Sequence, residues 1–275
     1  MSEVEAGQPT EQDALLGGHG SRVFTKWESF KTEHKPALAE FLGTFVLVLF
    51  GLGVNAQNTF NTYASESAYL SNNLGWGLGL TAGIYVSGGV SGGHLNPAVT
   101  VTMAYLRKFS WTRVLSYIIA QFAGAFLAAV VVYFIYNPAL NVMGGDKFSL
   151  ASAGIFATFP QPFNTIGSAF FAEFVGTAAL TLGIFAITDE RNNQGKGYVA
   201  LAIGLHLTAI GICLGWMTGY ALNPARDFAP RLFTALYGWG WEVFSAHDYY
   251  FWVPVVAPYA GGITGGLLYN LLILS

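Results

Sequence analysis

Six long apolar stretches dominate the pattern of hydrophobic and polar positions along the chain. They cover residues 36–55, 74–90, 114–136, 166–188, 198–216 and 251–273. Each has about 17–23 residues, close to the ~20 that an α-helix needs to cross ~30 Å of hydrocarbon. Only Glu40 and Glu173 are formally charged within them. The pattern predicts an all-α membrane protein with six transmembrane helices, because buried helices of a soluble protein would need amphipathic partners that this sequence lacks.

The second half of the chain repeats the first. The segment "AEFLGTFVLVLFG" begins at Ala39, and the similar "AEFVGTAALTLGI" begins at Ala172. Three predicted helices precede the second copy, so the second half enters the membrane from the opposite side. We therefore expect an inverted repeat with halves 36–136 and 166–273, joined by an extracellular loop over 137–165.

The tripeptide Asn-Pro-Ala occurs once in each half at an equivalent place, as Asn96, Pro97, Ala98 and as Asn223, Pro224, Ala225. Asn at the N-cap followed by Pro at the first helical position is a typical helix start. The segments that follow, "AVTVTMAYL" and "ARDFAPRLF", are too short to span a bilayer. We predict two re-entrant half-helices that enter from opposite faces and meet at mid-membrane, where irregular backbone must line protein or a water-filled cavity.

Two helix N-termini at one point would present two positive dipole ends, each equivalent to about half a charge. The two Asn side chains would add amide donors there. This arrangement suits a neutral permeant with oxygen atoms and repels cations, so the motifs predict the waist of a pore. A third Asn-Pro-Ala at 137–139 has no counterpart in the repeat, and we expect a turn there.

Charge sets the orientation. Charged residues are 10% of the 275, against about 25% in soluble proteins. Nine of the twelve Lys and Arg lie in the segment 1–35 or after the second and fourth predicted helices. By the positive-inside rule both termini are cytoplasmic. We expect residues 1–35 to form a disordered cytoplasmic tail, since they contain few aromatic residues and several Ser and Thr.

The remaining composition excludes several classes of function. The net charge of −3 does not indicate the excess of basic residues that is typical of nucleic-acid-binding proteins. Five scattered His and the single Cys213 offer no spacing suited to a metal ion, and we predict neither a metal nor a cofactor. The sequence shows no pairing of a nucleophile or acid with a base, so an enzyme is not expected.

The two Asn-Pro-Ala motifs, the second extended to "NPAR", and the two "AEF" starts give the chain a family resemblance. Over nearly all of residues 36–273 it resembles the major intrinsic protein family, the aquaporins and glycerol facilitators. The resemblance implies a homotetramer in the membrane lipid, in the plasma membrane, with a separate pore through each subunit. It also implies an aromatic and arginine constriction near the extracellular end of the pore.

By position, the resemblance assigns this selectivity filter to Trp76, Gly211, Tyr220 and Arg226. Water-selective members have His at the position of Gly211 and Phe at that of Trp76. A Gly here implies a wider, one-sided apolar corner, typical of the branch that conducts glycerol together with water. Tyr220 departs from that branch, which has Phe, and its hydroxyl would narrow the site or add a hydrogen bond.

The resemblance leads to a hypothesis of passive conduction. Asn96 and Asn223 would donate at the waist and Arg226 at the filter, while backbone carbonyls accept hydrogen bonds from the permeant along one wall. The carbonyls assigned to this wall belong to Gly92, Gly93, His94, Leu95, Gly219, Ala221 and Leu222. The alternative within the family is a pore for water only.

Glu40 and Glu173 permit two interpretations. Each carboxylate could accept hydrogen bonds from the N–H groups of its irregular pore loop and hold the carbonyls in place, a structural role that we also assign to Asp227. Ionisable residues within membrane spans also serve as proton relays. The second interpretation would make the protein a proton-coupled glycerol symporter.

Overall fold

The computed structural model describes residues 11–61, 67–106, 108–142, 146–192 and 196–274. These residues form helices and connecting segments and contain no β-strand. The elements are α1 Glu11–Phe60, α2 Ala68–Ser91, α3 Pro97–Tyr105, α4 Trp111–Val142, α5 Leu150–Ala153, α6 Ile166–Thr188, η2 Lys196–Tyr198, α7 Val199–Leu214, α8 Pro224–Thr234, η3 Ala235–Trp239, α9 Glu242–Tyr249, η4 Tyr250–Trp252, α10 Val253–Tyr269 and η5 Asn270–Leu274.

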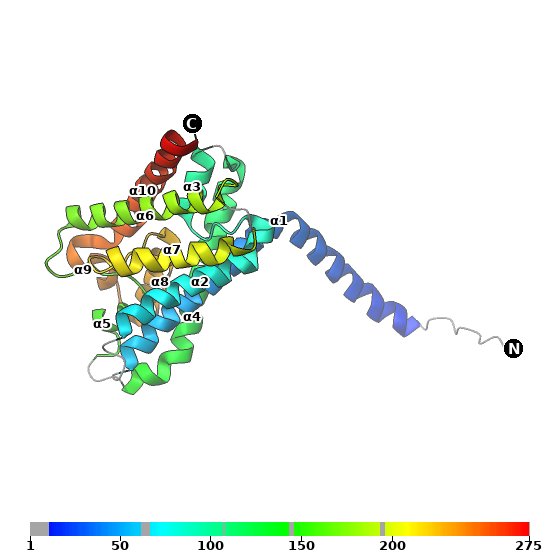
Figure 1. Cartoon of the computed structure of the whole chain (residues 1–275). Coiled ribbons are helices and arrows are strands. Elements are labelled where there is room, and N and C mark those ends of the chain that lie inside the picture. The colour runs from blue at the N-terminus through cyan, green and yellow to red at the C-terminus, as the bar shows by residue number, and fades with distance from the viewer. Residues whose placement is uncertain (1–10, 62–66, 107, 143–145, 193–195, 275) are drawn as a thin grey trace.

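The helices pack in two equivalent sets. In the first half α1 lies against α2 and α4, and in the second half α6 lies against α7 and α10. The halves meet where α2 contacts α7, and they interlock because α3 packs on α10 while α8 packs on α4 (Figure 1). Each short helix is thus held by a long helix of the other half. This arrangement confirms the predicted fold of six long helices and two half-helices in an inverted repeat.

Length and apolar character fit a membrane protein. Within the described part of the chain, four helical segments are long and apolar enough to cross a bilayer: Thr25–Phe60, Trp111–Val142, Ile166–Thr188 and Glu242–Leu274. α7 is apolar but has 16 residues. α2 has 24 residues but contains several Ser, Asn and Gly. Together these helices account for the six predicted spans, and the two weaker ones are those that contact each other between the halves.

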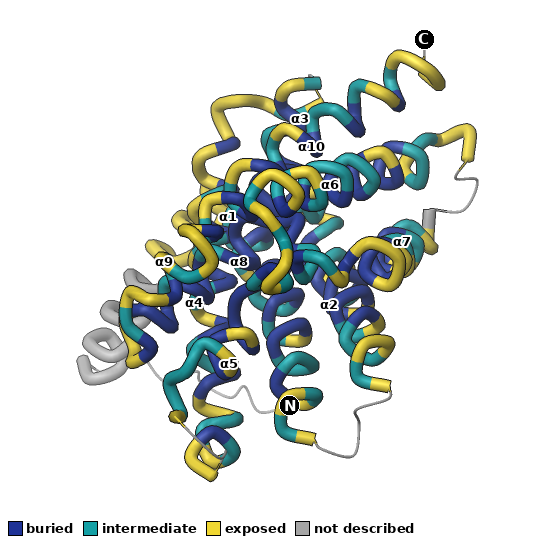
Figure 2. The backbone as a smooth tube through the Cα atoms, turned by 90° about the vertical axis from the view of Figure 1, so that its left-hand side faces the viewer, coloured by how far each residue is buried: buried dark blue, intermediate teal, exposed yellow. Residues whose placement is uncertain are grey.

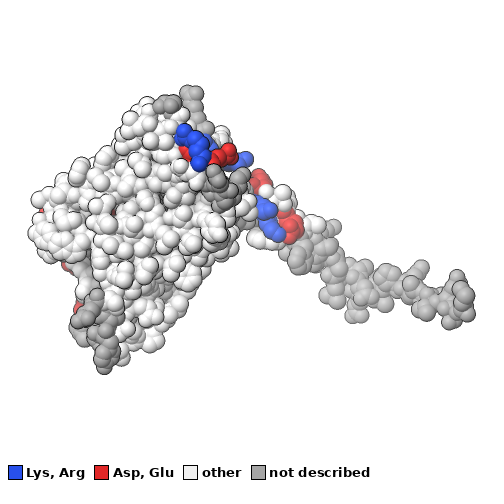
Figure 3. All heavy atoms as spheres, in the orientation of Figure 1, with Lys and Arg blue, Asp and Glu red and all other residues white. Residues whose placement is uncertain are grey.

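The outward surface is apolar. Figure 2 shows buried positions on the sides of the helices that face one another and exposed positions on the outer sides. Many exposed side chains are large and hydrophobic, among them Phe50, Leu78, Ile119, Phe171 and Leu205. On the face drawn in Figure 3, Lys and Arg lie at the upper edge of the bundle and on the neighbouring, projecting part of α1, together with Asp and Glu, and most of the remaining described surface is uncharged. An apolar belt of this kind is what a protein surrounded by lipid hydrocarbon needs on its surface.

The contact between α2 and α7 depends on two glycines. A Cβ on Gly77 would lie 2.5 Å from the carbonyl oxygen of Gly204 and would overlap Thr208 Oγ1. A Cβ on Gly204 would meet the carbonyl oxygen of Gly77 and Thr81 Oγ1 in the same way. The reciprocity follows from the two-fold relation of the halves. Small residues allow membrane helices to approach this closely.

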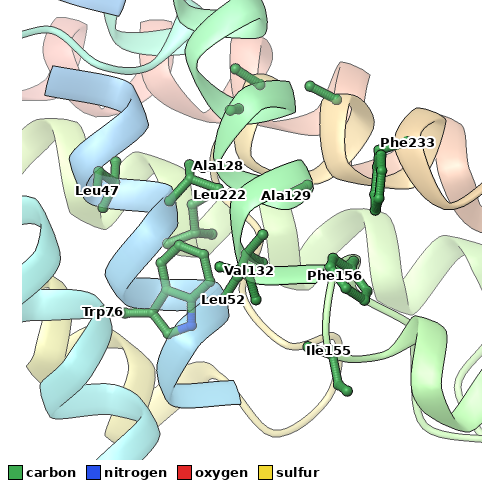
Figure 4. Close-up of a cluster of buried hydrophobic side chains, with 14 of the residues drawn as sticks. Leu47, Leu52, Trp76, Ala128, Ala129, Val132, Ile155, Phe156, Leu222 and Phe233 are labelled. Carbon is green, nitrogen blue, oxygen red and sulfur yellow. The ribbon is translucent and has the colours of Figure 1, made fainter. Parts of the chain in front are cut away.

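The core is shared by both halves. Figure 4 shows Leu47, Trp76, Val132, Leu222 and Phe233 in one buried cluster, although they come from four different helices and the segment before α8. Leu222 and Val132 are 1% exposed. Because the cluster spans the two halves, neither half buries its apolar surface alone.

Two expectations about the connecting segments are wrong. Residues 11–35, expected to be disordered, continue α1 in the N-terminal direction, and this part of the helix projects from the bundle (Figure 1). Residues 1–10 lie outside the described part of the chain. The third Asn-Pro-Ala is not a turn, because α4 continues through Pro138 to Val142. Proline removes one backbone hydrogen bond. Pro36 lies in the interior of α1 and Pro138 in the last turns of α4, and both helices continue past the proline.

Candidate conduction pathway

The two Asn-Pro-Ala motifs lie together at the centre of the molecule. Asn96 caps α3 and its Oδ1 accepts a hydrogen bond from the Ala98 N–H at 2.8 Å. Asn223 caps α8 in the same way, with Ala225 N at 3.0 Å. Pro follows at the first helical position of both short helices. The capping residues thus set the first residue of each half-helix.

Each Asn also reaches across to the other half. Asn96 Nδ2 donates to the carbonyl oxygen of Leu222, and Asn223 Nδ2 donates to that of Leu95, both at 2.8 Å. An amide nitrogen has two hydrogens, so one remains on each side chain after this bond. Both Asn side chains line the central cavity described below. The waist thus has a fixed pair of amide donors.

The loops before the half-helices have strained backbone. Leu95 and Leu222 have φ angles of 53° and 51°, in the left-handed region that side chains other than glycine rarely occupy. Gly92 and Gly93 precede the first, and Gly219 precedes the second, also with positive φ. Such strain persists only where the surroundings enforce it.

Glu40 and Glu173 hold these loops in place. Glu40 accepts hydrogen bonds from the backbone N–H groups of His94 and Leu95 at 2.9 and 2.7 Å. Glu173 accepts from those of Ala221 and Leu222 at 2.9 and 2.8 Å. Both carboxylates are fully buried. Additional donors complete each set: Ser91 Oγ and Gln121 Nε2 for Glu40, and Thr218 Oγ1 for Glu173.

A cavity of about 130 Å³ runs along the two pore loops and both Asn side chains, and we call it the central cavity. One wall is formed by the pore loops, with Gly92, Gly93, His94, Leu95 and Asn96 from the first half and Tyr220, Ala221, Leu222 and Asn223 from the second. The other walls are apolar and include Leu47, Leu80, Ile84, Val99, Ile184 and Ile203. Gly219 lies beyond this cavity and lines a separate hollow, the outer vestibule, together with Asn58, Tyr69, Asn73 and Thr158.

Three residues line both the central cavity and the outer vestibule: Trp76, Tyr220 and Arg226. They therefore mark the narrowing between the two hollows. The guanidinium carbon of Arg226 lies 4.0 Å from the centroid of the Trp76 ring, a cation–π contact. The Trp76 indole N–H donates to Asn55 Oδ1 at 3.1 Å. This bond fixes the ring plane against which the guanidinium lies.

Arg226 keeps unused hydrogen-bonding capacity. The side chain is buried, and Nη1 has no hydrogen-bond partner among the described residues. A buried donor without a partner costs free energy. A passing solute with oxygen atoms would satisfy it.

The fourth predicted filter residue lies beside this group. Gly211 lines neither hollow, because the space for its side chain is filled. A Cβ on Gly211 would lie 2.7 Å from Cζ and 2.9 Å from the hydroxyl of Tyr220, and it would overlap Asn73 Oδ1. The missing side chain therefore makes room for Tyr220 and Asn73.

A buried ion pair supports the half-helix α8 behind Arg226. Asp227 pairs with Arg231 at 2.9 Å, and the two side chains are 0% and 1% exposed. Asp227 Oδ2 also accepts hydrogen bonds from the backbone N–H and the hydroxyl of Thr158 at 2.8 and 2.6 Å. Arg231 donates to the carbonyl oxygens of Thr158 and Val243. The network fastens the segment around Thr158 and the start of α9 to α8, next to the filter.

The central cavity extends to Thr188 at the end of α6 and to Val199 at the start of α7. Asp189, just after α6, pairs with Arg191 and accepts a hydrogen bond from the Tyr269 hydroxyl at 2.7 Å. These contacts hold the pKa of the Asp189 carboxyl well below its usual range, with the Arg191 hydrogen bonds as the largest cause. Arg191 also donates to the Ile273 carbonyl oxygen. The connection after α6 is thereby tied to the end of α10.

Several residues of this pathway could not be found from the sequence. Asn55 is the last residue of a predicted helix and Asn73 lies just before the next one, neither with a motif around it, and Gln121 is one polar residue in an apolar helix. A signal existed for Arg231, since it follows Asp227 at the i,i+4 spacing of helical ion pairs. The sequence contains no comparable signal for contacts between distant helices.

Comparisons with known proteins agree with this geometry. Residues 26–269 match the profile of the family described as Major intrinsic protein. Aquaglyceroporin-2 of Rhizophagus irregularis is 53% identical over 272 residues, covering 97% of this chain and 84% of the relative. Aquaporin-7-2 of Laccaria bicolor is 43% identical, covering 85% and 73% of the two chains. The solved structure of the aquaglyceroporin from Plasmodium falciparum superposes with a TM-score of 0.80 at 32% identity, covering 87% of this chain and 97% of that one.

The fold and the pathway define an integral membrane channel with two half-helices. The chain belongs to the major intrinsic protein family. The resemblance seen in the sequence is thereby confirmed.

Proposed function

We propose that the protein is a passive channel that conducts glycerol and other small neutral polyols together with water. The observation that supports this most directly is the filter: Trp76 and Tyr220 bring two aromatic rings to the narrowing beside Arg226. Gly211 contributes by leaving the space that the Tyr220 ring occupies. A polyol has both an apolar carbon edge and hydroxyls. The aromatic rings can contact the carbon edge, and the hydroxyls can accept hydrogen bonds from the guanidinium.

The central cavity supports conduction without tight binding. Asn96 and Asn223 donate at the waist, and the carbonyls of the pore loops accept hydrogen bonds along the same wall. The other walls are apolar. A solute therefore replaces its hydrogen bonds to water with hydrogen bonds to the protein only on the side that faces the pore loops. No group in this proposed sequence of contacts needs to change its covalent state, and the protein is not proposed to be an enzyme.

Charge would exclude ions. Both half-helices begin at the waist and direct the positive ends of their dipoles there. Arg226 adds a full positive charge at the filter. Cations and protons therefore meet an unfavourable potential at two successive places, whereas a neutral solute does not.

We also propose that both termini and the connection after α6 face the cytoplasm. The gathering of Lys and Arg near the projecting part of α1 supports this orientation (Figure 3). The outer vestibule and the filter would then face the outside of a plasma membrane. A homotetramer is proposed from the family alone.

Stopped-flow light scattering on proteoliposomes tests the function. The wild-type chain is expected to pass both glycerol and water faster than protein-free vesicles. Gly211→His is expected to lower the glycerol permeability about tenfold or more, because each ~1.4 kcal/mol of added barrier is a factor of ten. Water permeability should fall less, and it serves as the check that the variant is folded. A wild-type protein that passes water but no glycerol would show a water channel instead.

A further inference from the structure

Tyr220 has a hydroxyl that the conduction pathway does not use. Its oxygen is buried and has no hydrogen-bond partner among the described residues. A Phe, which the family resemblance implies at this position, would present no such group. A buried hydroxyl without a partner costs free energy, so its position needs a physical reason.

The reason lies in the space beside Gly211. A Cβ at that position would be 2.9 Å from the Tyr220 hydroxyl and would overlap Asn73 Oδ1. The two oxygens therefore flank the same point, although one comes from α2 and the other from the loop before α8. Residue 211 places no side chain of its own there, because it is glycine.

Asn73 is oriented to serve as the acceptor. The residue is 1% exposed, and its Nδ2 donates to the Tyr69 carbonyl oxygen at 2.8 Å. This bond uses the amide nitrogen and turns Oδ1 toward Gly211. Oδ1 itself has no hydrogen-bond partner among the described residues. A carboxamide oxygen can only accept and a phenol can donate, so the two unsatisfied atoms are complementary.

We propose that Asn73 is a positioning residue that holds the Tyr220 hydroxyl in the space left by Gly211, away from the passage. A small rotation of either side chain, or a single water, joins the two oxygens. The ring of Tyr220 then presents an apolar edge to the permeant, and Arg226 remains the polar donor of the filter. This inference rests on the proposed glycerol conduction, and it explains how Tyr can replace Phe there.

A double-mutant cycle in proteoliposomes tests the pairing. Wild type, Asn73→Leu, Tyr220→Phe and the double variant are compared by the ratio of glycerol to water permeability. With Tyr220 present, Asn73→Leu is expected to lower this ratio about fivefold, the effect of one hydrogen bond of ~1 kcal/mol. In the Tyr220→Phe background the same substitution should change the ratio less than about twofold, because no hydroxyl remains to be released.

Asn72→Leu is the matched control. Its Oδ1 accepts a hydrogen bond from Asn58 at 2.7 Å, and its effect should be equal in both backgrounds. Equal losses from Asn73→Leu in both backgrounds, or no loss in either, would overturn the pairing. The wild-type glycerol flux separately tests the proposed function. If that flux is absent, the cycle is evaluated on water permeability, where a lack of coupling equally rejects the pairing.

Discussion

At the scale of single residues, the waist depends on the separate partners of the oxygen and the nitrogen in each Asn side chain. The oxygen caps its own half-helix, and the nitrogen donates to the carbonyl of the other half while one hydrogen stays available. Neither Asp nor Ser could do this, because Asp lacks the donor and Ser is too short to serve both partners. The equivalent bonds of Asn223 make the arrangement symmetric.

The capping role of the two Asn could be predicted from the motif, but their cross-contacts could not. Asn96 and Leu222 are 126 residues apart, and nothing in either local sequence specifies the other. The same limit applies to Asn55, which fixes Trp76, and to Asn73. Local chemistry can be read from spacing along one helix, whereas contacts between helices depend on how the helices pack.

Glu173→Gln tests whether the buried carboxylates are supports. Glu173 accepts three hydrogen bonds, two of them from backbone N–H groups. A Gln places an N–H group among donors, so we expect a loss of about 2 kcal/mol or more. This corresponds to a fall in the melting temperature of ~5 °C in detergent. The exposed Glu242→Gln is the control, and an unchanged melting temperature for Glu173→Gln would contradict the structural role.

At the scale of elements, apolar length predicted which segments become helices but not where they end. α1 begins at Glu11 rather than near Pro36, and α4 continues past Pro138. A proline removes one hydrogen bond and crowds the preceding turn, yet these helices of 50 and 32 residues continue past it. In α2, Gly79 and Gly83 face the backbone of α1, whereas the reciprocal contact with α7 falls on Gly77. Glycine positions in a sequence do not say which side of a helix faces which partner.

Gly77→Ala is expected to weaken the contact between α2 and α7. The added methyl group would overlap Thr208 and press on the Gly204 carbonyl, which corresponds to about 1–3 kcal/mol for an overpacked site. The melting temperature in detergent measures the loss. Gly89→Ala in the same helix is the matched control, since a Cβ there meets nothing within 4 Å. Equal melting temperatures for the two variants would show that the helices do not need this close approach.

At the scale of the whole molecule, the inverted repeat brings two equivalent loops to one point and joins them. A symporter must alternate between two arrangements of its halves around the substrate site. Here the Asn96 and Asn223 bonds link the halves at the waist, and α3 and α8 each pack on a helix of the opposite half. The fold thus favours one fixed passage over a rocking mechanism.

Proton coupling can therefore be tested directly. In proteoliposomes the initial glycerol flux is expected to rise in proportion to the concentration difference, because a continuous passage has no step that a bound solute must wait for. A pH gradient across the membrane, or a protonophore that removes it, should leave the rate unchanged within error, since Glu40 and Glu173 are fully buried and hydrogen-bonded to their loops. Protein-free vesicles give the background. Flux that saturates at low glycerol concentration and collapses with the protonophore would instead assign the two carboxylates to a proton relay.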